Sequence, residues 1–371
     1  MRKRLVGALA LAAVGSLALS ACGGSSSSTT SSSAAGGSSS AAAGGGGGVQ
    51  VGVILPDTQS SARWEAFDKP YLTDAFTAAG VKADIQNALG DKNKMATIAD
   101  SMIQEGVKVL IITNLDSPSG AQIESKAKSA GIKTIDYDRL TLGGSADYYV
   151  SFNNNKVGEL QGSTLIQCIG NKPNARIIEL NGSPTDNNAT LFKQGYDSQL
   201  DPKYKAGWTK VGDKSVPNWD NAQGGIIFEQ LLTAAGNKVD GVLAANDGLA
   251  NSVITVLKKV GLKVPVTGQD ATVQGLQNVL MGDQCMTVYK AVKLEAKGAA
   301  DAAVALIKGQ SVTTTGTTKD ATGGRDVPSI LETPVAITAD KVETVVQDGF
   351  VKASDLCTSA VQAACTKYGV K

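Results

Sequence analysis

The chain has 371 residues, a formal net charge of +1 and 19% charged residues. This length is too great for one ordinary hydrophobic core and suits two domains with appendages. A nearly balanced charge argues against a protein that binds nucleic acid through a basic surface. The sequence contains no histidine, which excludes Ser-His-Asp and Cys-His catalysis and histidine-ligated metal sites. The sequence also has no CxxC pair, phosphate loop or dinucleotide-binding motif. On these grounds together we expect no catalytic residue, no metal and no cofactor.

The first residues have the pattern of an export signal. Residues 2–4 are all basic, and the apolar stretch 5–19 that follows is too short to span a bilayer comfortably. Residues 19–22 read Leu-Ser-Ala-Cys, which resembles the lipobox of bacterial lipoproteins, where the signal is cut before a cysteine that then carries lipid. We expect 1–21 to be the signal peptide and Cys22 to anchor the protein at the extracytoplasmic face of the cell membrane. The alternative is a plain secretory signal with a chance cysteine.

A segment of low complexity follows Cys22. Residues 23–48 are almost wholly Gly, Ser, Ala and Thr, a composition that buries too little apolar surface to offset the entropy lost on ordering. We expect 22–48 to be the lipid-bearing cysteine and a flexible linker with a reach of roughly 25–30 Å.

From residue 49 the pattern alternates strand and helix. Short runs rich in Val and Ile alternate with helical spacings that end at glycine. Strands are predicted at 51–55, 81–86, 107–113 and 132–137, and helices at 64–80, 94–105 and 122–130. Such alternation is typical of a parallel sheet covered by helices on both faces.

The same pattern restarts after about residue 152. Strands are predicted at 175–180, 241–245, 264–268 and 286–289, and helices at 157–169, 221–235, 249–260 and 294–308. The segment 313–325 is rich in Thr, Gly and Asp and is predicted to be a loop, and 330–337 a final crossing strand. Two half-chains of this kind indicate an α/β protein with two similar domains.

Polar residues gather just past the predicted strands, where ligands bind in open parallel sheets. They are Asp57, Arg63, Trp64, Asn114, Asp116, Asp138, Arg139, Asp186, Asn187, Asn188, Asn246, Asp247, Gln269, Asp270 and Lys290. Asp and Asn also favour turns and helix N-caps, which is the competing explanation for each single position. That explanation accounts poorly for Arg63, Arg139 and Lys290, since Arg and Lys are not preferred caps.

This set suits a monosaccharide. Sugar hydroxyls both donate and accept hydrogen bonds, Asp accepts, Arg and Lys donate, and Asn does both. Aromatic rings can stack on the C–H faces of the sugar. The sequence has three tryptophans; core packing is the simpler role for Trp208, and Trp64 and Trp219 are the candidates for stacking.

Several stretches together resemble the D-xylose-binding proteins of periplasmic ABC importers and, slightly less closely, the multiple-sugar-binding proteins that feed a sensory kinase. The stretches lie at 63–64, 135–139, 151–154, 156–161, 182–189, 246–247, 268–270, 286–290 and 326–329. The resemblance implies the type I periplasmic-binding-protein fold, with two Rossmann-like lobes joined by a three-segment hinge. We expect the N-terminal lobe at 49–152 plus 290–325 and the C-terminal lobe at 153–289 plus 326–356. The tail 357–371 has no counterpart.

The resemblance also implies the binding residues. They are Arg63, Trp64, Asp138, Arg139, Asp186, Asn188, Trp219, Asp247, Asp270 and Lys290, with Trp64 and Trp219 on opposite faces of the sugar ring. The implied partners are a monosaccharide, D-xylose first, and an ABC permease with its ATPase; the protein is expected to be a monomer and to bind no nucleic acid. The stretches 58–62 and 217–218 depart from the xylose proteins, which leaves the preferred aldose and Trp219 less firmly assigned.

Three other kinds of function are compatible with parts of the sequence. A broad-specificity aldose binder and an added chemosensory role fit the same residues. An enzyme would need Asp186 and Asp247 as a glycosidase carboxylate pair. A transcription repressor with this kind of ligand domain would carry a helix-turn-helix where an export signal stands here.

Four further cysteines are expected in an oxidising compartment. A Cys357–Cys365 disulfide requires a bend in the tail, because one continuous helix would hold the two residues about 12 Å apart. We predict the Cys357–Cys365 pair in a bent tail, although four cysteines allow three connectivities. For Cys168 and Cys285 the simplest alternative is that they are buried free thiols.

Overall fold

The computed structural model describes residues 48–371. The predicted signal peptide 1–21, the predicted lipid-bearing Cys22 and all but the last residue of the predicted linker lie outside this range. No helix within residues 48–371 is long and apolar enough to cross a membrane.

The N-terminal lobe is built on a seven-stranded sheet in the order β10-β11-β5-β4-β3-β1-β2. All neighbours are parallel except the β10–β11 hairpin. The strands are β1 (Val51–Leu55), β2 (Ala83–Asn87), β3 (Val109–Ile112), β4 (Lys133–Tyr137), β5 (Tyr148–Phe152), β10 (Gly316–Asp320) and β11 (Arg325–Glu332).

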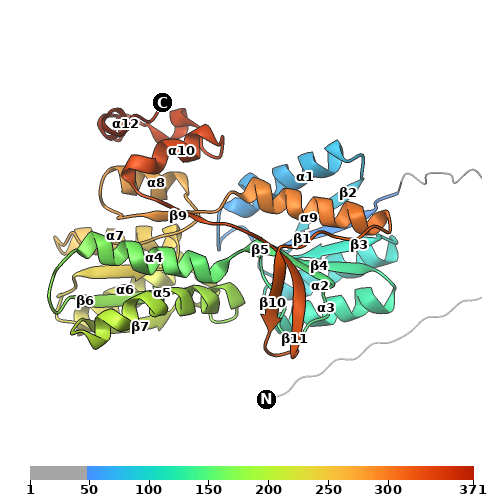
Figure 1. Ribbon diagram of the computed structural model, residues 1–371, viewed down its shortest axis with the longest axis horizontal. Helices are drawn as coiled ribbons and strands as arrows, with labels where there is room; N and C mark the ends of the chain where they lie inside the picture. Colours follow the sequence, from blue (N-terminus) through green and yellow to red (C-terminus); the bar gives the residue numbers. More distant parts are fainter. Residues whose placement is uncertain (1–47) are drawn as a thin grey trace, which may run out of the picture. The chain divides into compact units, whose positions relative to one another are not determined.

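Helices cover both faces of this sheet, as successive side chains of β1 show. Val53 faces a core formed with Leu72 and Phe76, whereas Ile54 faces a core formed with Met95. The first core lies under the π-helix η1 (Trp64–Asp68), α1 (Lys69–Ala78) and α9 (Val292–Ile307), and the second under α2 (Lys92–Gln104) and α3 (Ser117–Ser129). Figure 1 shows α1 and α9 side by side. The central strand β1 is therefore apolar on both faces, as expected for a parallel sheet covered on both sides.

The C-terminal lobe has a sheet in the order β7-β6-β8, with β6 (Arg176–Asn181), β7 (Thr209–Ser215) and β8 (Gly241–Ala244). The predicted strand 264–268 forms one parallel bridge, between Val266 and Val242. Beside it, β9 (Thr287–Tyr289) pairs antiparallel with β12 (Val335–Ile337). The surrounding helices are α4 (Asn154–Ile169), α5 (Asn187–Lys205), the 3-10 turn η2 (Pro217–Trp219), α6 (Asn221–Ala234), α7 (Asp247–Lys259) and α8 (Val273–Leu280).

The chain passes between the lobes three times, and the third passage corrects the sequence analysis. The predicted loop 313–325 contains β10, and β11 pairs with β5 of the N-terminal sheet. Residues 326–332 therefore belong to the N-terminal lobe, although they were expected in the other. The crossing falls at residues 333–334, because β12 pairs with β9 of the C-terminal lobe. A Thr- and Gly-rich composition suggested a loop, but the hairpin gains its backbone partners at the sheet edge.

Residues 339–371 form a small helical cap, which includes the tail 357–371. It contains η3 (Ala339–Lys341), α10 (Val342–Gln347), α11 (Ala353–Leu356) and α12 (Gln362–Tyr368). The chain bends between α11 and α12, and a disulfide joins Cys357 to Cys365, the pairing for which a bent tail was required. Leu356 and Cys365 are fully buried in a core shared with Leu276 of α8.

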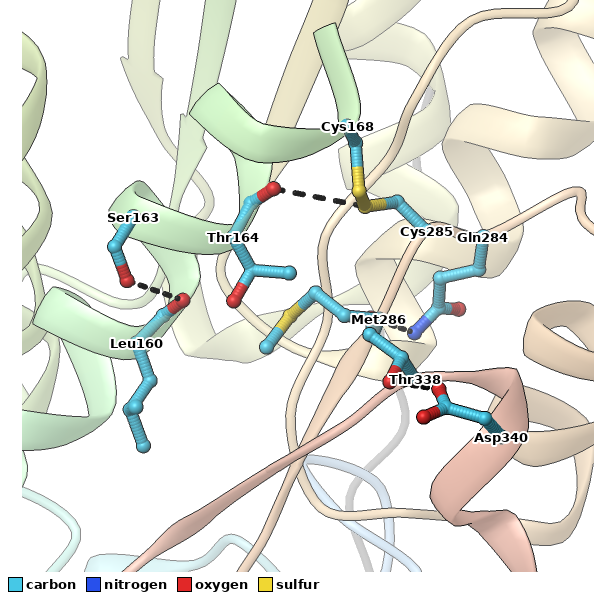
Figure 2. Close-up of a disulfide and its surroundings, with 9 residues drawn as sticks. All are labelled: Leu160, Ser163, Thr164, Cys168, Gln284, Cys285, Met286, Thr338 and Asp340. Atoms are coloured by element: carbon cyan, nitrogen blue, oxygen red, sulfur yellow. Dashed lines mark hydrogen bonds between the residues drawn. A yellow bond between two sulfur atoms is a disulfide. The ribbon is translucent and has the colours of Figure 1, made fainter. Parts of the chain in front are cut away.

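A second disulfide joins Cys168 to Cys285. The sequence left this pairing open, and the structure excludes the alternative that the two residues are free thiols. Figure 2 shows the bond between the end of α4 and the segment that leads into β9. Their separation of 117 residues gave no sequence signal, because only the fold brings the two segments together.

Candidate functional site

A cavity of about 30 Å³ lies between the lobes. Its walls come from the carboxyl ends of strands in both lobes, the position at which open α/β sheets bind ligands. It is lined by Ser60, Ser61, Arg63, Trp64, Asp138, Arg139, Asp186, Asn188, Phe192, Trp219, Asn246, Gln269, Asp270 and Lys290. Nine of the ten binding residues expected from the sequence are in this set.

Arg63 is the electrostatic centre of the N-terminal wall. Its guanidinium donates two hydrogen bonds to Asp68, at 2.7 and 2.8 Å, one to Asp138 at 2.8 Å and one to Glu295. Burial alone would lower the pKa of Arg63, but the three carboxylates raise it well above its usual value. Burial would raise the pKa of Asp138, yet Arg63, Lys290 and Arg139 hold it below its usual value. Both groups therefore carry full charge at the cavity wall.

Trp64 is held rigidly beside these charges. Its indole nitrogen donates to the hydroxyl of Ser60 at 3.1 Å. The guanidinium carbons of Arg63 and Arg139 lie 4.7 and 5.4 Å from its ring centroid, within range of cation–π attraction. A buried aromatic ring fixed in this way offers an apolar surface without losing further rotamer freedom when a ligand binds.

Trp219 is the aromatic group on the C-terminal wall. Its indole nitrogen donates to Asp186 at 3.0 Å, and its ring packs so closely on Gly182 that a Cβ there would lie 2.0 Å from it. The backbone of Asn218 and Trp219 is left-handed, with φ of 54° and 55°. Non-glycine residues adopt this conformation only when surrounding contacts enforce it, so the fold fixes the position of this ring.

The polar groups of the two lobes contact one another across the cavity. Asn188 donates to the Asp138 carbonyl at 3.0 Å and to its carboxylate at 3.1 Å. The Nε of Arg139 lies 3.2 Å from an oxygen of Asp186, and Ser61 donates to Asp270 at 3.3 Å. The lobes are therefore in a closed arrangement, in which groups from both sides reach the same small space.

Asp247 is the exception among the predicted binding residues, because it does not line the cavity. It is buried behind the wall and accepts hydrogen bonds from Thr272, Gln284 and Thr287. Its neighbour Asn246 lines the cavity instead. The strand-end position is next to the cavity, but the sequence could not show which of the two adjacent side chains lines it.

Five residues that line the cavity were not among the ten binding residues expected from the sequence. Asn246 and Gln269 stand at predicted strand ends and could have been included on that ground. Phe192 lies on α5, a helix that the sequence analysis did not predict. Ser60 and Ser61 come from the stretch 58–62 that departs from the xylose proteins, so this departure borders the cavity directly.

A larger hollow of about 430 Å³ adjoins the cavity and shares Ser60, Arg139, Asp186 and Trp219 with it. The Arg139–Asp186 ion pair thus stands between the two spaces.

Comparison with known proteins agrees with this geometry. A model of the periplasmic binding protein domain matches residues 51–311. The chain is 37% identical over 312 residues to the D-xylose-binding periplasmic protein of Escherichia coli K12, covering 83% of this chain and 92% of that protein. It is 35% identical over 326 residues to the multiple sugar-binding periplasmic receptor ChvE of Rhizobium radiobacter, covering 82% and 92%.

A solved structure has the same architecture. It is the carbohydrate transporter solute-binding protein of Chloroflexus aurantiacus in complex with D-glucose, with 31% sequence identity and a TM-score of 0.76. The match covers 83% of this chain and 98% of that one. The chain therefore belongs to the periplasmic binding proteins and has their type I fold.

Proposed function

We propose that the chain is the extracytoplasmic substrate-binding lipoprotein of a sugar ABC importer, and that it binds D-xylose or a similar aldose between its lobes. The observation that carries this proposal is the cavity itself, where charged donors and acceptors from both lobes surround a small space beside two fixed tryptophans. The lipobox-like stretch before Cys22 supports the lipid anchor. The similarity to a D-xylose-binding protein and to a multiple sugar-binding receptor supports a sugar as the ligand.

The mechanism is binding without chemistry. In an open form the sugar meets one set of groups, and closure brings the second set onto it, so the ligand favours the closed form. The permease would then recognise closed protein. A micromolar dissociation constant corresponds to about −8 kcal/mol, which over the ten or so heavy atoms of a pentose stays within the limit of about −1.5 kcal/mol per atom.

Broad aldose specificity is the second candidate, and an added chemosensory role is compatible with it. The multiple-sugar relative and the glucose-bound neighbour favour it, as does the altered stretch that supplies Ser60 and Ser61 to the cavity. The glycosidase alternative loses its support, because Asp247 is outside the cavity and cannot face a substrate together with Asp186.

The decisive experiment is calorimetry of residues 49–371 with xylose, glucose, arabinose, galactose and ribose. Micromolar binding of xylose, at least tenfold tighter than that of the hexoses, would support the first candidate. Similar affinities for several aldoses would support the second. If no sugar binds more tightly than millimolar, the sugar-binding proposal is wrong.

Truncating the tryptophan of the C-terminal wall should weaken sugar binding. Trp219→Ala removes the ring and its hydrogen bond to Asp186, and we expect the dissociation constant to rise at least tenfold in calorimetry. Trp208→Ala is the matched control, since Trp208 is also buried but donates to the distant Lys172 carbonyl. It should lower stability and leave affinity unchanged. Equal affinities of wild type and Trp219→Ala would remove Trp219 from the site.

A further inference from the structure

Asp247 occupies an unusual environment for a buried carboxylate. It is the first residue of α7 and is 2% exposed. One oxygen accepts from the backbone N–H of Thr272 at 2.9 Å and from its hydroxyl at 3.1 Å. The other accepts from the Gln284 amide at 2.8 Å and the Thr287 hydroxyl at 2.9 Å. All four donors are neutral, so hydrogen bonds and not a counter-ion compensate the buried carboxylate.

These hydrogen bonds join three separate segments of the C-terminal lobe. Asp247 belongs to the start of α7, Thr272 caps α8 by accepting from Gly275 at 3.0 Å, and Gln284 and Thr287 lead into β9. The approach is close, since a Cβ on Gly268 or Gly275 would lie 2.2 Å from an Asp247 oxygen. Only glycine leaves room for the carboxylate at both places.

Two of these segments, the start of α7 and the turn before α8, carry residues that line the cavity. Asn246 directly precedes Asp247, and the Asp247 N–H donates to the Gln269 carbonyl at 3.0 Å. The Thr287 hydroxyl donates to Asp247 and accepts from the Ala271 N–H at 3.1 Å. Asp270 and Ala271 have φ of 93° and 48°, a conformation that persists only where surrounding contacts enforce it. The carboxylate of Asp247 is the common anchor of those contacts.

We propose that Asp247 is a positioning residue, which never touches the sugar but holds Asn246, Gln269 and the strained turn at Asp270 in the geometry that binds it. This proposal rests on the proposed function, because its test measures the affinity for a sugar. The Cys168–Cys285 disulfide adds to the same support, because it fixes the residue next to Gln284 (Figure 2).

The charges around Asp247 make the proposal testable by pH. Burial, and then the nearby charge of Asp270, raise the pKa of Asp247 to about 7, against the lowering effect of its hydrogen bonds. Asp270 is itself paired with Lys290 at 3.0 Å. Above pH 7 the carboxylate accepts all four hydrogen bonds, whereas the protonated form below pH 7 must give up an acceptor position. Affinity for the sugar should therefore fall severalfold between pH 8 and pH 6.

The test compares wild type with Asp247→Asn by calorimetry with the aldose that the wild type binds best, at several pH values from 6 to 8.5. We expect the variant to bind at least tenfold more weakly at pH 8 and to lose the pH dependence. Asp283→Asn is the matched control: Asp283 precedes Gln284 but pairs with Lys258 and Lys263 at the surface. Its affinity and pH profile should equal those of wild type.

Thr287→Val is a second variant, to be used if Asp247→Asn does not fold. Valine keeps the shape of the threonine side chain. It removes the hydroxyl between Ala271 and Asp247, and it should weaken binding about three- to tenfold. Wild-type affinity and pH profile in folded Asp247→Asn or Thr287→Val would overturn the positioning role while leaving the proposed function intact. A wild type that binds no aldose would overturn the proposed function, and this inference with it.

Discussion

Arg63→Met is expected to destabilise the folded protein by about 3–5 kcal/mol, the usual cost of leaving buried charges without their partner. Three buried carboxylates depend on this one guanidinium, which contacts Asp68, Asp138 and Glu295. The loss should be measured by denaturant unfolding at pH 7. Sugar binding should disappear in the same variant, because Asp138 is held at the cavity wall by Arg63.

The pH dependence of the variant provides an independent check. Burial already raises the pKa of Asp68 and of Glu295, and Arg63 opposes that rise. Without Arg63 the folded-state pKa values rise further above the unfolded ones. At any pH between the unfolded-state pKa and the folded-state pKa of a carboxyl, the folded state binds more protons than the unfolded state. The free energy of unfolding therefore falls as pH rises through this range. The deficit of Arg63→Met against wild type should therefore be smaller at pH 5 than at pH 8.

Arg325→Met is the matched control in the same lobe. Arg325 is partly exposed, forms an ion pair with Asp320 at 3.4 Å, donates to the Ala146 carbonyl at 2.7 Å and does not line the cavity. Asp320 is buried but keeps hydrogen bonds from the backbone N–H groups of Gly143, Thr322 and Gly323, so the loss of Arg325 should cost only about 1–2 kcal/mol. If Arg63→Met costs no more than this control, Arg63 is not the electrostatic centre of the N-terminal wall.

Most of the cavity-lining residues could be predicted from the sequence because parallel strands bring their carboxyl ends to one edge. Reading the residues after each predicted strand needs no tertiary information, and it found Arg63, Arg139 and Lys290, which line the cavity. The same rule fails at Asp247, because adjacent residues at a strand end point in different directions. Asn246 lines the cavity while Asp247 turns away to accept hydrogen bonds from Thr272, Gln284 and Thr287, which are distant in sequence.

The elements that were missed depend on tertiary contacts in a similar way. Helix α5 has a weak apolar pattern and contains Pro202. It forms against α4, where a Cβ on Gly158 or Gly195 would meet backbone atoms at 2.0 and 2.2 Å. Likewise β10 has the composition of a loop, and only its pairing with β11 makes it a strand. Local propensity is a weak guide where close packing or an edge partner decides the structure.

Removing the Cys168–Cys285 disulfide by a double change to serine should cost about 3–5 kcal/mol. The two residues are 117 apart in sequence, and closing a loop of about 100 residues is worth roughly 4.7 kcal/mol in the chain-entropy model. Denaturant unfolding of the double variant and of wild type, both oxidised, measures the difference. The slope with denaturant concentration should rise as well, because an unfolded chain without the cross-link exposes more surface.

The Cys357/Cys365 double serine variant is the matched control, because its loop spans only 8 residues. The same model gives less than about 3 kcal/mol for such a loop. A larger loss for the short loop than for the long one would contradict the entropic argument.

The two disulfides should also differ in their effect on sugar binding. Cys285 adjoins Gln284, which donates to Asp247, so loss of the Cys168–Cys285 bond should loosen the support of Asn246 and weaken sugar binding. Loss of the tail disulfide should leave affinity unchanged, since neither of its cysteines lies beside a donor to Asp247.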